Sequence, residues 1–277
     1  MIDMRDALEN PTHEDVSAWF QALADELLNR TAFVIAGKAH RLLEIEFYYQ
    51  DTGHEDPFAH GDEMQKTHNR WYFHRKGGEY RGGSFKGLDI TFGKQGTHGG
   101  ILIRTIEALD GEDSTVNGCS LCVDRMLELT DEDSVADLDT SIGASDVWDT
   151  DAPIYLEQRD DMEARDIHAT ARVGLTLKRM YENPEMPAYL MRPLRFLTDP
   201  TIPKGKLYTV AALIEQELDD DAIRELTNTT RASLKKGREA IADGKTQESF
   251  EPWKGKKLKT ADLYTLHGVC LNVYGEQ

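Results

Sequence analysis

The chain has 277 residues, of which 39% are hydrophobic and 30% are charged, as in a globular protein with one sizeable domain or two small ones. Its net charge of −18 would exclude nucleic acid as a partner only if the acidic residues were evenly spread. They are concentrated instead: residues 107–166 hold 19 acidic and 3 basic side chains, whereas residues 201–277 hold 12 of each sign.

Three features argue against a secreted or membrane protein. The N-terminal residues are acidic and polar, unlike those of a signal or transit peptide. The longest apolar runs, such as residues 32–36, are far too short to span a bilayer. The three cysteines fit a reducing compartment better than a disulfide framework. We therefore expect a cytoplasmic protein with no membrane partner.

The first half of the chain predicts one helix followed by a sheet. Thr12-x-x-Asp15 resembles a capping box, and the apolar residues behind it recur at helical spacing, which predicts a helix over roughly 14–29. β-branched and aromatic runs separated by glycine-rich turns predict strands near 31–36, 40–49, 70–74, 87–92 and 100–106.

The second half predicts fewer strands and more helices. Residues 123–129 have the pattern of a short helix, and residues 172–175 and 192–197 have that of two strands. After Pro203 the pattern becomes helical over 208–217, 220–227, 229–242 and 260–273. We expect an α+β domain with a curved, mostly antiparallel sheet flanked by helices, and a helical C-terminal extension over 201–277 packed on it.

The run Arg41-Leu-Leu-Glu-Ile-Glu-Phe-Tyr48 carries an acid in a strand-like segment. Alternation directs Glu46 away from Leu43 and Ile45. A carboxylate fixed on a strand beside Tyr48 suits a general base in an aromatic pocket. The alternative is a half-buried strand with solvated glutamates.

Short segments further along the chain carry a resemblance. They are Glu44-Ile-Glu46-Phe-Tyr48, Asp56-Pro-Phe-Ala-His60, residues 69–80, Ile101-Leu-Ile-Arg104, Arg172-Val-Gly-Leu and Arg192-Pro-Leu-Arg-Phe. In this order, over about residues 20–200, they resemble the motifs of the alkyladenine (3-methyladenine) DNA glycosylase family. The resemblance implies a formyltransferase C-terminal-domain-like fold for residues 1–200, as the catalytic domain.

The resemblance also implies roles for individual residues. Glu46 would activate a water molecule, and Arg104 and backbone groups near Val173 would help to hold that water. Tyr48 and His60 would sandwich an extruded base, because aromatic faces recognise a flipped nucleotide by stacking. The remaining predicted substrate contacts are Tyr72, Tyr80 and Asp89. His60 could instead be a structural histidine, and Arg104 an ion-paired structural arginine.

Residues 70–87 interleave aromatic and basic side chains, as a surface that follows a nucleic-acid backbone does. The predicted DNA contacts are Arg70, Arg75, Lys76, Arg81 and Lys86. We expect the acidic residues 107–166 to point away from this face. An ordinary hairpin with a solvated basic face is the alternative.

Two departures from the family pattern concern the hairpin. It is short, with Arg81-Gly-Gly-Ser84 where the family has an intercalating tyrosine, so no aromatic wedge is evident unless Phe85 serves as one. Asp89 stands where the family has an asparagine. Its carboxylate accepts hydrogen bonds but cannot donate unless protonated, which favours a base with an amino or hydroxyl donor.

We expect no metal and no cofactor. His54, Glu55, Asp56, His60 and Asp62 could ligate a metal, but they lack the His-Glu-x-x-His spacing and fall in a loop. Cys119-x-x-Cys122 has no second half-site, which leaves small buried side chains at a helix start. No Walker loop and no Rossmann fingerprint occurs.

These observations predict a monofunctional DNA glycosylase that flips a damaged or modified base and hydrolyses its N-glycosidic bond. We expect a monomer acting on duplex or single-stranded DNA, in repair or in defence against phage. The alternatives are a non-catalytic nucleic-acid binding module and a hydrolase of free nucleosides or nucleotides.

Overall fold

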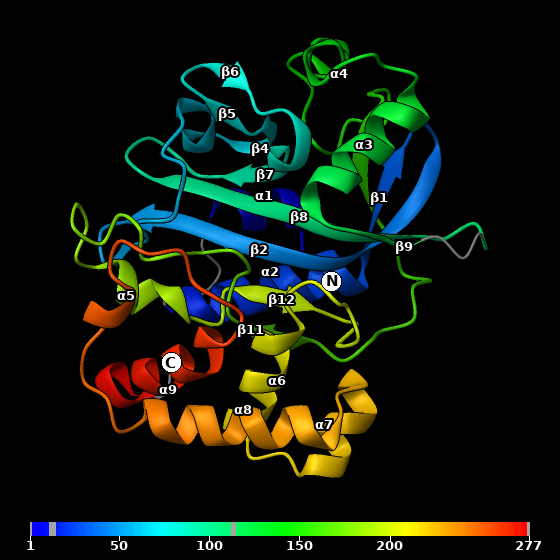
Figure 1. Cartoon of the computed structure of the whole chain (residues 1–277). Coiled ribbons are helices and arrows are strands. Elements are labelled where there is room, and N and C mark those ends of the chain that lie inside the picture. Colours follow the sequence, from blue (N-terminus) through cyan, green and yellow to red (C-terminus); the bar gives the residue numbers. More distant parts are fainter. Residues whose placement is uncertain (1, 11–14, 112–114, 276–277) are drawn as a thin grey trace. The chain divides into compact units, whose positions relative to one another are not determined.

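The computed structural model describes residues 2–10, 15–111 and 115–275 (Figure 1). The chain folds into two compact units. The first consists of Met1–Glu55 and Ala59–Ile167, and the second of Asp56–Phe58 and His168–Gln277. The second unit therefore begins ahead of residue 201 and includes Arg172 and Arg195 together with the C-terminal helices. No described helix combines the length and apolarity that crossing a membrane requires.

The first unit is built on an antiparallel sheet with strand order β10-β1-β2-β8-β7-β4. The bounds are Thr31–Ile35 for β1, Lys38–Asp51 for β2, His68–Phe73 for β4, Leu88–Phe92 for β7, His98–Ala108 for β8 and Ile154–Gln158 for β10. Short strands β3 (His54–Glu55) and β9 (Thr115–Asn117) pair with β2 and β8. All five strands expected in this region are confirmed, and the expected mixture of helices with a largely antiparallel sheet is confirmed with them.

Helix α2 (Val16–Asn29) confirms the first predicted helix and covers one face of the sheet. Its N-cap is Asp15, whose side chain accepts from the backbone N–H of Ser17. Thr12, the other half of the predicted capping box, lies outside the described residues. Phe20 of α2 stacks on Phe47 of β2 with ring centroids 4.5 Å apart. Phe47 therefore faces α2, and Glu46 and Tyr48 face the other side of the sheet.

Shorter elements complete the first unit. They are α1 (Met4–Glu9), η1 (Glu63–Lys66), β5 (Arg75–Lys76), β6 (Glu79–Tyr80), η2 (Gly83–Phe85), α3 (Cys119–Thr130) and α4 (Val135–Ile142). The short helix predicted over 123–129 is confirmed as part of the longer α3.

The second unit is mostly helical. It contains β11 (His168–Thr170) paired with β12 (Arg195–Leu197), then α5 (Met186–Leu190), α6 (Lys206–Glu215), α7 (Asp220–Thr227), α8 (Arg231–Gly244), η3 (Glu251–Trp253) and α9 (Asp262–Tyr274). The four helices predicted after Pro203 are confirmed. Leu177, Trp253, Leu266 and Val269 belong to its buried core.

The strand predicted over 172–175 is wrong. Val173 and Gly174 form a turn instead, and Gly174 has a φ of 87°, in the left-handed region that favours glycine. Arg172 is fully buried because its guanidinium forms a two-pronged ion pair with Asp56. The apolar pattern thus marked partly buried residues in and beside a turn. Of the strand predicted over 192–197, the structure forms only Arg195–Leu197.

Candidate active site

A buried cluster of charged side chains joins β2 to β8. Arg104 Nε of β8 lies 3.0 Å from Glu44 Oε1 and 3.3 Å from Glu46 Oε1, both on β2. Both carboxylates have no exposed surface, and Arg104 is 6% exposed. Buried charges require close partners of opposite sign, and this cluster supplies them. Arg104 therefore forms the buried ion pair of the structural alternative, and one of its two partners is Glu46, the predicted catalytic base.

The environment of Arg104 determines its charge. Burial lowers the pKa of its guanidinium, but the negative charges of Glu46 and Glu44 outweigh burial and hold the pKa above the ordinary value. Arg104 is therefore positively charged at every physiological pH. It presents a fixed cation to Glu46, and its Nε atom also contacts Glu44.

The two glutamates differ in their other contacts. Glu44 Oε2 accepts a hydrogen bond from Thr105 Oγ1 at 2.6 Å, and Thr105 Oγ1 accepts one from Asn117 Nδ2 at 2.8 Å. Glu46 Oε2 accepts from the Tyr48 hydroxyl at 2.8 Å. Glu44 is thus connected to structural polar side chains, whereas Glu46 is connected to an aromatic residue predicted to bind the base.

Strand pairing brings Glu46 onto the same sheet face as two other predicted site residues, Asp89 and Tyr72. Glu46 pairs with Leu102, Leu102 pairs with Asp89, and Asp89 pairs with Tyr72. Directly paired residues in an antiparallel sheet point to the same side. The strands β2, β8, β7 and β4 lie side by side (Figure 1), so Glu46 and Asp89 are two strand spacings apart, about 10 Å. This face carries both the acid and the base-binding candidates.

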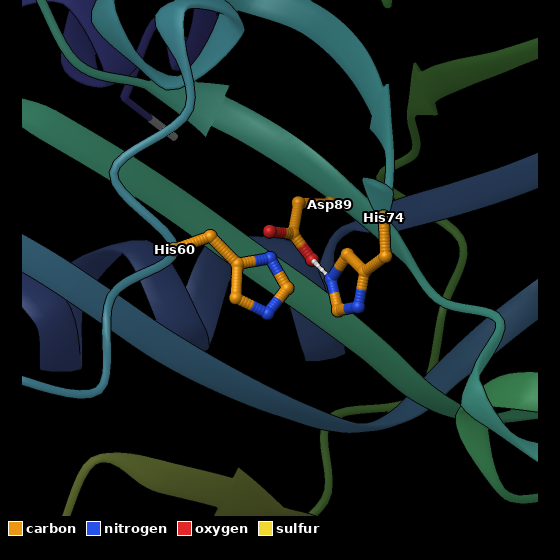
Figure 2. A group of neighbouring side chains, drawn as sticks. All are labelled: His60, His74 and Asp89. Carbon is orange, nitrogen blue, oxygen red and sulfur yellow. Dashed lines mark hydrogen bonds and ion pairs between the residues drawn. The ribbon is translucent and has the colours of Figure 1, made fainter. Parts of the chain in front are cut away.

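His60, His74 and Asp89 form a second cluster, shown in Figure 2. His74, directly after β4, has its Nε2 2.7 Å from Asp89 Oδ1 on β7. His60 comes from the loop before η1, and its ring meets that of His74 nearly edge-on, with centroids 4.3 Å apart. Tyr72 lies beside both imidazoles, 6.2 Å from His60 and 5.8 Å from His74 between ring centroids. The structure therefore brings together three of the predicted base contacts.

The surroundings of Asp89 hold it in place. Gln65 Nε2 donates to Asp89 Oδ2 at 3.2 Å, and both residues are 1% exposed. Gly100 leaves room for this contact, because a methyl group on its Cα would lie 2.5 Å from Asp89 Oδ2. A methyl group on Gly87 would lie 2.5 Å from His74 Nδ1. Both oxygens of Asp89 thus already accept from protein donors, so a contact between Asp89 and a base stays a prediction.

The neutral ring of His60 can be tested directly. Partial desolvation, together with the positive charge that His74 carries when protonated, lowers the pKa of His60 to about 4. We expect its imidazole signals in a pH titration followed by NMR to shift near pH 4, below the ordinary 6.5. His74→Gln should raise that midpoint, because it removes the repelling charge. A midpoint near 6.5 in the unaltered protein would contradict the lowered pKa of His60. Loss of these signals in His60→Gln identifies them as those of His60.

The basic hairpin contacts the acidic segment. Arg75 Nη2 and the Tyr80 hydroxyl both bind Asp139 of α4, and Lys86 pairs with Asp124 of α3. The expectation that residues 107–166 point away from this hairpin is wrong. The physical reason for the observed contact is charge complementarity, because the acidic helices α3 and α4 supply the counterions of the basic side chains.

The remaining predicted DNA contacts differ in their surroundings. Arg70 donates to the backbone oxygen of Ala144, and Arg81 Nε donates to that of Arg75 at 3.3 Å. Lys76 is exposed. Phe85 in η2 is 70% exposed, so its ring is available for stacking.

Two of the loop residues that could have ligated a metal, His54 and Asp56, have other partners. His54 Nδ1 lies 2.9 Å from the backbone oxygen of Tyr49, and Asp56 holds Arg172. Cys122 at the start of α3 is buried, and burial raises the pKa of its thiol. The thiol donates to the backbone oxygen of Arg104 at 3.4 Å. The prediction of a small buried side chain at a helix start is confirmed for Cys122.

Sequence reasoning missed two site residues, His74 and Gln65. The signal for His74 was present, since it follows Tyr72 at the two-residue spacing that keeps side chains on one face of a strand. Gln65 had no comparable signal, because its role depends on the capping of η1 by Asp62, which turns the Gln65 side chain back to the Asp62 backbone N–H.

Comparison with known proteins gives one informative relative. No protein-family model matches the chain. The chain is 33% identical over 187 residues to a protein of Acanthamoeba polyphaga mimivirus named uncharacterized protein L759, and the match covers 61% of this chain and 86% of the viral protein. At this identity and coverage, the chain belongs to the same family as mimivirus protein L759.

Proposed function

We propose that the protein is a monofunctional DNA glycosylase that releases a damaged or modified base. The observation that carries the proposal is the buried Glu46, held by Arg104 and Tyr48 on the same sheet face as Asp89 and Tyr72. This arrangement fits the motif resemblance over residues 20–200.

The chemistry assigns one role to each group. The water oxygen attacks C1′ of the nucleotide and gives its proton to Glu46, while the base departs with the electron pair of the N-glycosidic bond. Positive charge develops on the sugar in this oxocarbenium-like state, and a nearby carboxylate stabilises such a charge. Arg104 fixes the carboxylate, whose oxygens lie 3.3 and 3.4 Å from guanidinium nitrogens. Geometry of this kind is what a general base requires.

The aromatic and imidazole rings supply the base-binding part of the proposal. The rings of Tyr72, His60 and His74 lie close together, with centroids 4.3 to 6.2 Å apart. An extruded base is recognised by stacking on such rings and by hydrogen bonds to its edge. His74, whose ring is held by Asp89, could supply an edge contact in place of Asp89 itself.

The proposal is tested by base release. The protein is incubated with oligonucleotides that carry a panel of modified bases, and with phage genomic DNAs, and abasic sites are measured. Release of a free base without strand cleavage supports a monofunctional glycosylase. Binding of DNA without release would indicate the non-catalytic module, and release from free nucleosides alone would indicate the nucleoside hydrolase.

One observation favours the nucleoside hydrolase as the second candidate. Arg75 and Lys86 already have acidic partners in Asp139 and Asp124, so two predicted phosphate contacts are neutralised within the protein. The DNA glycosylase must therefore rely on Lys76, Arg81 and the exposed Phe85, or exchange those ion pairs for phosphates.

Charge reversal on the hairpin distinguishes these two functions. Lys76→Glu and Arg81→Glu should each weaken DNA binding and reduce the slope of log affinity against log salt by about 1, because each removes a phosphate contact. Arg159→Glu is the matched control, since Arg159 is not part of the hairpin and pairs with Asp161. Binding to single- and double-stranded DNA is measured by fluorescence anisotropy. Unchanged affinity in both hairpin variants would remove this hairpin from the DNA-binding surface.

A further inference from the structure

We propose that His60, His74 and Asp89 form a binding site for a divalent transition-metal cation of the zinc class. The proposal stands independently of base excision, because it concerns only what these three side chains can coordinate.

The three side chains converge from separate segments of the first unit. His60 comes from the loop before η1, His74 from the residue after β4, and Asp89 from β7. One ligand atom from each lies within 4.8 Å of the other two. Ligand atoms on one tetrahedral zinc ion lie about 3.4 Å apart, as bonds of about 2.1 Å require. Binding therefore requires the exposed His60 ring to move closer to His74 and Asp89.

The donor set selects the kind of ion. Two imidazole nitrogens and one carboxylate oxygen suit zinc and other borderline divalent metals, whereas calcium and magnesium prefer oxygen ligands alone. Three protein ligands leave coordination positions for water or a bound molecule. The exposure of His60 places those open positions toward solvent. A bound ion of this kind could lower the pKa of a coordinated water.

The site has the outer support that metal ligands have in proteins. Gln65 fixes Asp89 by donating to its second oxygen, and the capping contacts of η1 hold Gln65. Gly100 and Gly87 make room for Asp89 and for the His74 ring, respectively. Partners of this kind orient metal ligands, and their loss weakens affinity by about 10–100-fold.

The contact between His74 and Asp89 can also be explained without a metal. The 2.7 Å separation of His74 Nε2 and Asp89 Oδ1 also fits a hydrogen-bonded ion pair. That reading leaves His60 outside the ion pair, although its ring lies 4.3 Å from that of His74. Coordination of a shared ion gives all three side chains a role.

Metal titration of the full chain separates the two readings. The chelator-treated protein is titrated with Zn²⁺ by calorimetry and with Co²⁺ by visible absorption. We expect one tightly bound ion per chain and Co²⁺ absorption bands typical of nitrogen and oxygen ligands. His60→Gln, His74→Gln and Asp89→Asn should each weaken binding at least about tenfold.

The control is His68→Gln, which removes a histidine of β4 that pairs with Glu9 outside the cluster. It should bind as the unaltered protein does. His60→Gln alters an exposed ring, so it carries the test if His74→Gln or Asp89→Asn fails to fold. Absence of saturable binding, or equal binding in His60→Gln, would overturn the proposal. The titration contains no DNA, so neither result depends on base release.

Discussion

Replacing Glu46 by glutamine should reduce the rate of base release by about 10²–10⁴-fold, which is the usual contribution of a general base. The amide keeps the shape of the side chain but cannot take a proton from water. DNA affinity should stay unchanged, because Glu46 is fully buried and contacts Arg104 and Tyr48. Single-turnover release of the base identified by the oligonucleotide panel measures the effect, and anisotropy measures the affinity.

Glu44→Gln is the matched control for this assignment. Glu44 lies two residues away on the same strand, is equally buried and contacts the same Arg104 nitrogen. Its effect should be smaller, because it acts on Arg104 and Thr105 and not on the water. Thermal unfolding shows whether both variants are folded. Equal losses of rate from the two folded variants would contradict the choice of Glu46.

Asp56→Asn should cause the largest loss of stability among single polar substitutions, about 3–5 kcal/mol, as expected when one partner of a buried pair is removed. Arg172 has no exposed surface and Asp56 is 1% exposed, and both guanidinium Nη atoms bind the carboxylate. The substitution leaves the Arg172 charge buried without compensation. At about 2–4 °C per kcal/mol, the unfolding midpoint should fall by roughly 10 °C.

The control for that loss is Asp161→Asn. Asp161 also forms a close ion pair with an arginine, Arg159, but its side chain is 68% exposed. Water screens such pairs, so the unfolding midpoint should stay unchanged. Calorimetry of both variants at neutral pH measures the difference. Equal midpoints would show that the Asp56–Arg172 pair contributes no more to stability than a surface pair.

The elements that were predictable from sequence share a local cause. The strands over 31–35, 38–51 and 98–108 contain runs of β-branched, aromatic and other apolar residues and are bounded by turn residues. The helices after Pro203 repeat apolar residues at helical spacing. In each of these segments local propensity and burial agree, so pattern alone finds them. The sheet face that Glu46 occupies was predictable for the same reason, since alternation on β2 fixes it, whereas the choice of Glu46 over Glu44 rested on the resemblance.

The features that were not predictable depend on partners distant in sequence. The turn at Val173 is fixed by the pairing of Arg172 with Asp56, 116 residues away. The pairing of the hairpin with acidic helices depends on Arg75 and Asp139, which are 64 residues apart. Strand β10 (Ile154–Gln158) escaped notice because its alternating residues lie within the most acidic part of the chain. A summed charge indicates composition and gives no information on which side chains meet.

The opposite chemistry of the two faces of β2 restricts how this protein can diverge. Phe47 packs against Phe20, and the neighbouring Glu46 contacts Arg104. A single inserted or deleted residue before Glu46 would exchange the two faces, placing a carboxylate against α2 and a phenyl ring against a buried cation. The damage would extend to the core and the site together. Homologous chains should therefore vary in length in the loops and keep residues 44–49 free of gaps.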